Sequence, residues 1–185
     1  AAMTGLALQS TITRDSVISR KNYFYPDLPS SYQRSQYEDP LCVGGFVEFP
    51  TADGMRRIEL TRIHIEEDTG KLTHMPDGSS LIDYNRAGVP LMEIVSEPVI
   101  ASAEEARLYF QTLHQLLSWI GVNSGNLEEG ALRCDANVSV RPEGQKEFGS
   151  KVEIKNVNSF RNVERAINYE IERQIDVLSN GGKII

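Results

Sequence analysis

The sequence predicts an α+β protein built mainly from antiparallel strands, with helices packed on one face of the sheet. Short runs that are rich in β-branched residues, or that alternate apolar and polar side chains, fill most of the first hundred residues. Two later segments instead repeat apolar residues at helical spacing, and an alternating hairpin lies between them. A succession of strands, helix, hairpin and helix favours this fold class.

The predicted strands of the first half are joined by recognisable turns. They cover residues 11–18, 43–49, 57–66, 81–84 and 91–95. Asp53-Gly54 is a strong hairpin signal between the second and third of these strands. Residues 69–80 read as a loop, with a turn at Pro76-Asp77-Gly78.

Two helices are predicted in the second half. Ser102 and Glu105 form a capping box, and the helix after them runs to Ile120, with Gly121 as its C-cap. Asn158-Ser159 caps the final helix. The expected core-facing residues are Ala106, Tyr109, Leu113, Leu116, Leu117 and Ile120 in the first helix, and Val163, Ala166, Ile167, Ile171, Ile175 and Leu178 in the second.

The hairpin between the helices has one apolar and one polar face. Its outgoing strand, residues 132–140, places Arg133, Asp135 and Asn137 on one side, and its return strand places Glu153 and Lys155 there. Such a face fits an exposed sheet surface with cross-strand ion pairs. Asp and Asn are depleted in strands, however, and this favours a functional role for the row.

Length, charge and cysteine usage exclude several classes of protein. The chain has 185 residues, which is one domain's worth, and a net charge of −7. A negative chain does not bind phosphate backbone broadly, so any nucleic acid must meet a local basic patch or a partner subunit. No run of 18 apolar residues occurs, which argues against a membrane protein. Cys42 and Cys134 have neither disulfide nor zinc spacing, which favours a reducing compartment.

Residues 64–71, HIEEDTGK, are the strongest candidate for chemistry. Carboxylates placed this close repel one another, and a hard divalent cation such as Mg²⁺ removes the conflict while also binding substrate phosphates. The alternative is a solvated acidic turn. Strand alternation points Glu67 with the neighbouring isoleucines, so its carboxylate must be paired, bound to metal or beyond the end of the strand.

A basic and aromatic segment, residues 20–27 (RKNYFYPD), is the second candidate. Cations beside aromatic rings favour phosphate contact and stacking. The alternative is a buried aromatic wedge with a solvated basic edge. A third candidate is the acidic pair Glu128-Glu129, in the loop that precedes the alternating hairpin.

Six segments in one order resemble a single family, the B subunit of the aspartyl/glutamyl-tRNA amidotransferase with its archaeal E-subunit relatives. They are residues 20–27 (RKNYFYPD), 64–71 (HIEEDTGK), 83–91 (DYNRAGVPL), 93–98 (EIVSEP), 128–139 (EEGALRCDANVS) and 153–161 (EIKNVNSFR). Long motifs in register over nearly the whole chain are far more specific than one short pattern.

The resemblance implies a catalytic cradle with a glutamine synthetase-like fold, using ATP and Mg²⁺. Its substrates would be misacylated Glu-tRNA(Gln) and Asp-tRNA(Asn). The side-chain carboxylate on the tRNA is phosphorylated, and ammonia from the glutaminase A subunit then displaces phosphate. A C subunit completes the expected complex, in the bacterial cytoplasm or in an organelle.

The resemblance also assigns residues. Glu67 corresponds to a Mg²⁺ ligand of the family, and Glu66 lies beside it. The polar residues of the family's catalytic cradle and ammonia channel correspond to Lys21, Tyr23, Asp135 and Glu153. The same site would include Glu128, Glu129, Arg133 and Lys155, which would bind substrate or nucleotide with Tyr23.

Residues 1–185 correspond to the central part of the family's catalytic domain. The family's Gly-Leu-Glu-Val-His start motif and its C-terminal tRNA-binding domain have no counterpart in this sequence. We therefore expect a piece of a longer protein that is inactive alone. Two other functions stay open: a glutamine synthetase-like ligase acting on a free amino acid, and a scaffold that only contacts tRNA or the A subunit.

Overall fold

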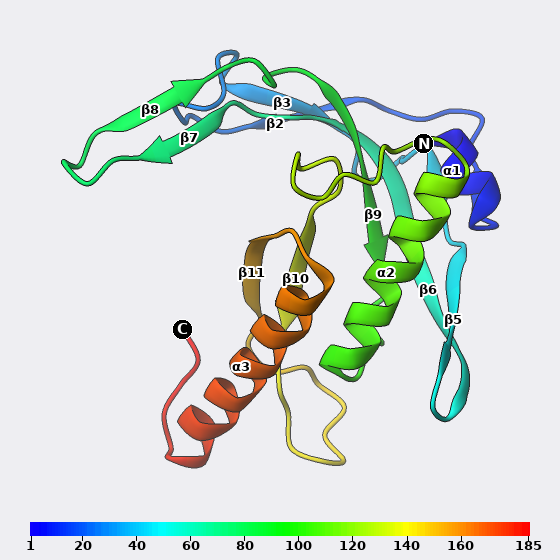
Figure 1. The fold of residues 1–185 in the computed structure, drawn as a ribbon, viewed down its shortest axis with the longest axis vertical. Helices are drawn as coiled ribbons and strands as arrows, with labels where there is room; N and C mark the ends of the chain where they lie inside the picture. The colour runs from blue at the N-terminus through cyan, green and yellow to red at the C-terminus, as the bar shows by residue number, and fades with distance from the viewer. The chain divides into compact units, whose positions relative to one another are not determined.

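The chain folds into two compact units, whereas its length indicated one domain's worth of residues. The computed structural model describes residues 1–185 and every side chain except that of Asn156. The first unit comprises residues 1–46 and 58–99, and the second comprises residues 47–57 and 100–185. Three helices and antiparallel strand pairs confirm the predicted α+β class (Figure 1).

The sequence suggested a single sheet, but the strands form several separate sheets. The described chain has one sheet of five strands and three of two strands. The larger sheet has the order β1-β4-β6-β5, with β9 also paired to β6. Its strands are β1 (Thr11–Ile12), β4 (Cys42–Val43), β5 (Phe46–Thr51), β6 (Gly54–Glu67) and β9 (Pro90–Ser96). A short helix, α1 (Ala2–Ala7), precedes β1.

Two hairpins complete the first unit. One pairs β2 (Ser19–Asn22) with β3 (Tyr32–Ser35), and the other pairs β7 (Lys71–His74) with β8 (Ser80–Asp83). The predicted loop over residues 69–80 was therefore wrong in part. Strand β7 lies inside that range, whereas β8 agrees with the strand predicted over residues 81–84. Three of the four residues of β7 are exposed, so β7 lacks the apolar alternation that marks a strand in sequence.

The predicted strand over residues 11–18 was too long. Only Thr11 and Ile12 pair with β4. Thr13 then donates its backbone N–H to the Leu41 carbonyl and its hydroxyl to the Pro40 carbonyl. These bonds satisfy the backbone without extending the ladder, so β-branched composition alone overestimated the strand.

The second unit packs two helices with a hairpin. Its elements are α2 (Ala103–Trp119), β10 (Cys134–Val138), β11 (Val152–Val157) and α3 (Phe160–Ser179). Ser102 and Ser159 cap the two helices as predicted, each hydroxyl accepting a backbone N–H at 3.1 Å. The core contains Ala103, Phe110, Val138, Val163 and Ile167. None of the described helices is both long and apolar enough to cross a membrane.

The buried side chain of Gln174 connects α3 to β10 through hydrogen bonds. Its fully buried amide donates to the Val138 carbonyl at 3.0 Å and accepts the Val140 N–H at 3.1 Å. It also donates to the buried Glu170 carboxylate, which Arg173 holds through two further bonds. Beyond this point the predicted apolar stripe fails as a core face, because Ile175 and Leu178 are exposed.

Candidate metal centre

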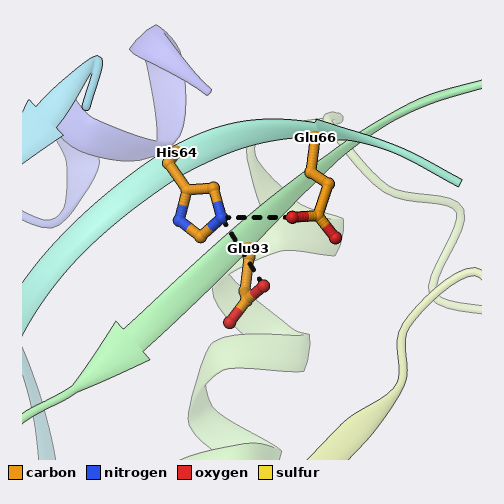
Figure 2. A group of neighbouring side chains, drawn as sticks. All are labelled: His64, Glu66 and Glu93. Atoms are coloured by element: carbon orange, nitrogen blue, oxygen red, sulfur yellow. Dashed lines mark ion pairs between the residues drawn. The ribbon is translucent and has the colours of Figure 1, made fainter. Parts of the chain in front are cut away.

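The side chains of His64, Glu66 and Glu93 converge in the first unit. Alternation along β6 places His64 and Glu66 on one face, and antiparallel pairing sets Glu93 of β9 opposite His64. Figure 2 shows the imidazole facing both carboxylates, with Nε2 at 3.8 Å from Glu66 and 3.5 Å from Glu93. One ligand atom from each residue lies within 4.8 Å of the others, so the group could hold a metal ion.

Hydrogen-bond donors on β3 fix the Glu66 carboxylate. The Ser35 hydroxyl donates to it at 2.6 Å, and the Gln33 amide donates at 2.7 Å. Burial alone would raise the pKa of Glu66, but the His64 ring, the Ser35 hydroxyl and the charge of Lys21 stabilise the anion, and its pKa is lowered. Glu66 is therefore a carboxylate whose charge and direction are set before any ligand arrives.

Arg62 determines which His64 nitrogen carries the proton in the neutral ring. The Arg62 Nε–H donates to His64 Nδ1 at 3.2 Å. A guanidinium has no acceptor, so Nδ1 must be the acceptor and the proton sits on Nε2, facing the carboxylates. In this tautomer His64 orients Glu66 and Glu93. Metal ligation by Nε2 would require the other tautomer.

Glu67 occupies a different environment, although it is next to Glu66. It is the last residue of β6, and Arg34 holds its carboxylate through an ion pair and through the backbone N–H at 3.0 Å. Hydrogen bonding to this backbone N–H, opposed by burial and aided by the guanidinium, lowers the pKa of Glu67. Strand alternation points Glu67 with the isoleucines, and its pairing with Arg34 and its position at the end of β6 explain how its carboxylate is accommodated there.

Lys21 of β2 and Tyr23, which directly follows β2, extend the same polar region. The charge of Lys21 acts on Glu66. Burial of Tyr23, together with the charges of Asp27 and Glu66, raises the pKa of its hydroxyl. The structure therefore brings four of the sequence-predicted residues, Lys21, Tyr23, Glu66 and Glu67, into one unit. His64 and Glu93 complete the group.

The donor set fits a hard divalent cation. Glu66 uses two acceptor positions on Ser35 and Gln33, and a carboxylate has about four, so two remain. Glu93 is half exposed, which leaves room for water and phosphate oxygens beside it. One or two carboxylates plus substrate phosphates is the usual Mg²⁺ arrangement, in which the ion neutralises charge on a transferring phosphoryl group.

The remaining predicted residues lie in the second unit and form a solvated face. Asp135, Glu153 and Lys155 are exposed on the β10–β11 hairpin, as alternation predicted, while their neighbours turn inward. Lys155 pairs with Glu153 at 3.4 Å, and Asn137 lies directly across from Glu153. Arg133 precedes β10 and is also exposed.

Glu128 and Glu129 are exposed in the loop between α2 and β10. Asn126 accepts both of their backbone N–H groups, at 3.1 and 3.3 Å. The loop is also tied to α2, because the His114 ring bonds the Gly125 carbonyl at 2.7 Å. His114 therefore packs against Phe160 and anchors the loop to α2.

Sequence reasoning missed His64 and Glu93 as members of the cluster. The parity of β6 already placed His64 beside Glu66, and that was the available signal. Glu93 requires the β6–β9 register, which no local pattern reveals. The donors Ser35 and Gln33 likewise come from a strand about 30 residues upstream, paired with β2.

Comparison with known proteins identifies the class of this fold and site. A sequence model of the GatB/GatE catalytic domain matches residues 1–183, so the chain belongs to this family. The B subunit of the aspartyl/glutamyl-tRNA(Asn/Gln) amidotransferase of Roseiflexus sp. (strain RS-1) is 70% identical over 185 residues. The B subunits of the Herpetosiphon aurantiacus and Oleidesulfovibrio alaskensis enzymes are 60% and 57% identical over 186 residues.

These alignments cover the whole of this chain but only part of each relative. The share is 38% of the Roseiflexus and Herpetosiphon proteins and 39% of the Oleidesulfovibrio protein. The chain therefore spans well under half the length of these relatives.

Proposed function

We propose that this chain is part of the ATP-dependent catalytic centre that amidates misacylated Glu-tRNA(Gln) and Asp-tRNA(Asn). The observation that carries the proposal is the His64–Glu66–Glu93 cluster, set beside Lys21 in a chain of the GatB/GatE catalytic domain family. Two carboxylates for a cation and a lysine for phosphate oxygens are the groups that phosphoryl transfer needs.

The proposed reaction has two balanced steps. A side-chain carboxylate oxygen of the tRNA-bound amino acid attacks the γ-phosphorus of ATP, and ADP leaves. Ammonia then attacks the acyl carbon, the bond from carbon to the phosphorylated oxygen breaks, phosphate leaves with its electron pair, and one proton of the nitrogen passes to the phosphate. A carboxylate oxygen is a poor leaving group, so the first step makes the second feasible.

Each predicted residue has a place in this proposal. Glu66 and Glu93 would hold the cation, and Glu67, which is paired with Arg34, would lie beside them as a further carboxylate. Lys21 stabilises charge on the phosphoryl oxygens, and Tyr23 orients the nucleotide. The solvated group, which binds polar parts of the substrates or guides ammonia, comprises Glu128, Glu129, Arg133, Asp135, Glu153 and Lys155. We further propose a glutamine synthetase-like cradle, acting with A and C subunits in the bacterial cytoplasm.

Calorimetry of Mg²⁺–ATP binding tests the assignment on the full-length protein. We expect the affinity to fall at least about tenfold in Glu66→Gln and Glu93→Gln, and less in Glu67→Gln, because only Glu67 is already neutralised by an arginine. Glu143→Gln is the matched control, since Glu143 is an exposed carboxylate of the other unit. Equal affinity in wild type and all variants would make this chain a scaffold.

A second assay separates the two enzymatic functions. The complete complex is supplied with ATP and either misacylated tRNA or free glutamate. The proposal expects hydrolysis of ATP to depend on the tRNA. Hydrolysis stimulated by free glutamate without tRNA would instead show a ligase that acts on the free amino acid.

A further inference from the structure

The β2–β3 hairpin carries two chemically different faces. Residues paired across antiparallel strands share a face, and the register pairs Lys21 with Gln33 and Arg20 with Arg34. The first face, Lys21 with Gln33 and Ser35, is the one that contacts or acts on Glu66. The opposite face carries Arg20, Asn22, Tyr32 and Arg34, and we call it the Arg20 face.

The Arg20 face concentrates positive charge that its surroundings do not neutralise. Arg20 and Arg34 lie directly across from each other, and both guanidinium groups cover the Tyr32 ring, at 4.9 and 5.7 Å from its centroid. Like charges in this arrangement destabilise a hairpin. Arg34 has Glu67 as a partner, but no described carboxylate lies within ion-pair distance of Arg20. This occurs in a chain whose net charge is −7.

An exposed aromatic ring adjoins this face on a loop that is held firmly. Phe24 is 93% exposed, while Leu28 of the same loop is buried. The Tyr84 hydroxyl donates to the Pro26 carbonyl at 2.6 Å, and the Gly70 N–H donates to the Asp27 carbonyl at 2.8 Å. The loop therefore does not use Phe24 for its own packing, and presents the ring to solvent from a fixed backbone.

A guanidinium stacked on one ring, next to a second ring open to solvent, is how proteins bind single-stranded nucleic acid. Unpaired bases offer their flat faces to such a ring, whereas the bases of a duplex are already stacked. Arg20 and Phe24 are about 13 Å apart along an extended chain, so linked nucleotides can reach both. The hairpin groups that contact or act on Glu66 belong to the opposite face, whereas Arg34 of the Arg20 face pairs with Glu67.

We propose that the Arg20 face, together with Phe24, binds the single-stranded 3′ end of the tRNA substrate. Arg20, held by Tyr32, contacts a backbone phosphate, and Phe24 stacks on an unpaired base. This surface rests on the proposed function, because that function supplies the tRNA. It also answers the sequence expectation that nucleic acid must meet a local basic patch on an acidic chain.

Binding of tRNA to the complete complex tests the surface, with intact tRNA(Gln) and with tRNA(Gln) trimmed of its unpaired 3′ nucleotides. We expect Arg20→Ala to weaken binding of intact tRNA about tenfold and to reduce the slope of log K against log salt by about 0.7, the value of one phosphate contact on a single strand. Arg14→Ala, which removes another exposed cation of the same unit, should change the affinity by less than about twofold.

Phe24 requires its own series, because the ring and its hydrophobicity must be separated. Phe24→Ala and Phe24→Leu should both weaken the binding of intact tRNA by about 5- to 100-fold. Phe24→Trp should retain the affinity, because only a ring can stack. Trimmed tRNA should bind wild type, Arg20→Ala and Phe24→Ala equally, since the contact is already lost.

Three results would overturn the proposal that this surface binds the 3′ end of tRNA. One is equal weakening of intact and trimmed tRNA, which would indicate contact with the duplex. Another is a raised KM for ATP with unchanged tRNA affinity, which would make this a nucleotide site. The third is full activity of Phe24→Leu, which would show that the reaction does not need the aromatic ring of Phe24. A complex that binds tRNA as expected but never hydrolyses ATP would support this surface and overturn the proposed function.

Discussion

Glu66 and Glu153 are both strand carboxylates in predicted site motifs, yet their surroundings are opposite. Glu66 is largely covered and receives hydrogen bonds from Ser35 and Gln33. Glu153 is half exposed, and it forms a 3.4 Å ion pair with Lys155, a residue on its own strand. One carboxylate is fixed by distant parts of the chain, and the other is free to follow a ligand. The difference separates a preorganised group from an adaptable one.

The largest expected effect comes from removing the fixed carboxylate. In the complete complex, Glu66→Gln should lower ATP hydrolysis at least about 100-fold, because a cation ligand and its charge are lost together. Glu153→Gln should cost about tenfold or less, since an adaptable group can be replaced by water. The measurement is the initial rate at saturating tRNA. Equal losses would end the distinction between the two carboxylates.

Stability should also separate a buried side chain from a solvated one within the second unit. Gln174→Ala removes the side-chain partner of the Val138 carbonyl and of the Val140 N–H, and it leaves Glu170 with the bonds from Arg173 alone, so it should lower the free energy of unfolding by about 2–3 kcal/mol. Glu153→Ala removes only a solvated pair and should change it by less than about 1 kcal/mol. Urea unfolding of both variants gives the comparison. A Gln174→Ala variant as stable as wild type would contradict it.

The electrostatics of Glu66 give a pH prediction. Its pKa is lower in the folded chain, so the carboxylate stabilises the fold above its unfolded pKa of about 4.3. This contribution is lost as the pH falls through the lower, folded pKa. Ser35→Ala removes one donor and should raise the pKa of Glu66, which reduces the stability gained above a pH of about 4.3 by about 1 kcal/mol.

Carboxyl ¹³C NMR of glutamate-labelled protein reports this pKa directly, and acid unfolding reports its energetic consequence. Ser79→Ala is a suitable control, because Ser79 bonds Asp77 in an exposed turn of the same unit. A Glu66 pKa that does not move in Ser35→Ala would mean that His64 and Lys21 set it without Ser35.

The smallest expected effect concerns a hydroxyl that the fold buries without a partner. Tyr109 Oη is buried and has no hydrogen bond among the described residues, and burial raises its pKa. Tyr109→Phe removes this unsatisfied group and should stabilise the second unit by up to about 1 kcal/mol. A loss of stability in thermal unfolding would instead reveal a bond made by the hydroxyl.

Local sequence predicted the elements whose own residues specify them. The capped helices, the Asp53-Gly54 turn and the alternating faces of β10 and β11 follow from neighbours in the chain. Strand β7 did not, because pairing with β8 forms it although three of its four residues are exposed, whereas β8 agrees with the strand predicted over residues 81–84. Burial of the last apolar residues of α3 also failed, since periodicity shows a stripe and not what covers it.

The candidate site likewise contains residues that local sequence could indicate and residues that only the tertiary structure brings together. The segment 64–71 was predicted to hold a site because its charges are adjacent in sequence, and family resemblance singled out Glu66, Glu67, Lys21 and Tyr23. His64 and Glu93 meet only through the β6–β9 register, and Arg34 reaches Glu67 from another hairpin. Tertiary structure decides which of the two adjacent glutamates pairs with an arginine and which faces a histidine. The number of charges in the segment does not predict this.

The two-faced hairpin makes this segment intolerant of insertions. Adding one residue to β2 would reverse the sides of everything that follows it, placing an arginine toward Ser35 and Glu66 and sending Lys21 outward. An extra residue in the turn between β7 and β8 would lengthen only an exposed tip. A scan of single-codon insertions through the gene should therefore find inactive variants in the β2–β3 hairpin and active variants in the β7–β8 hairpin.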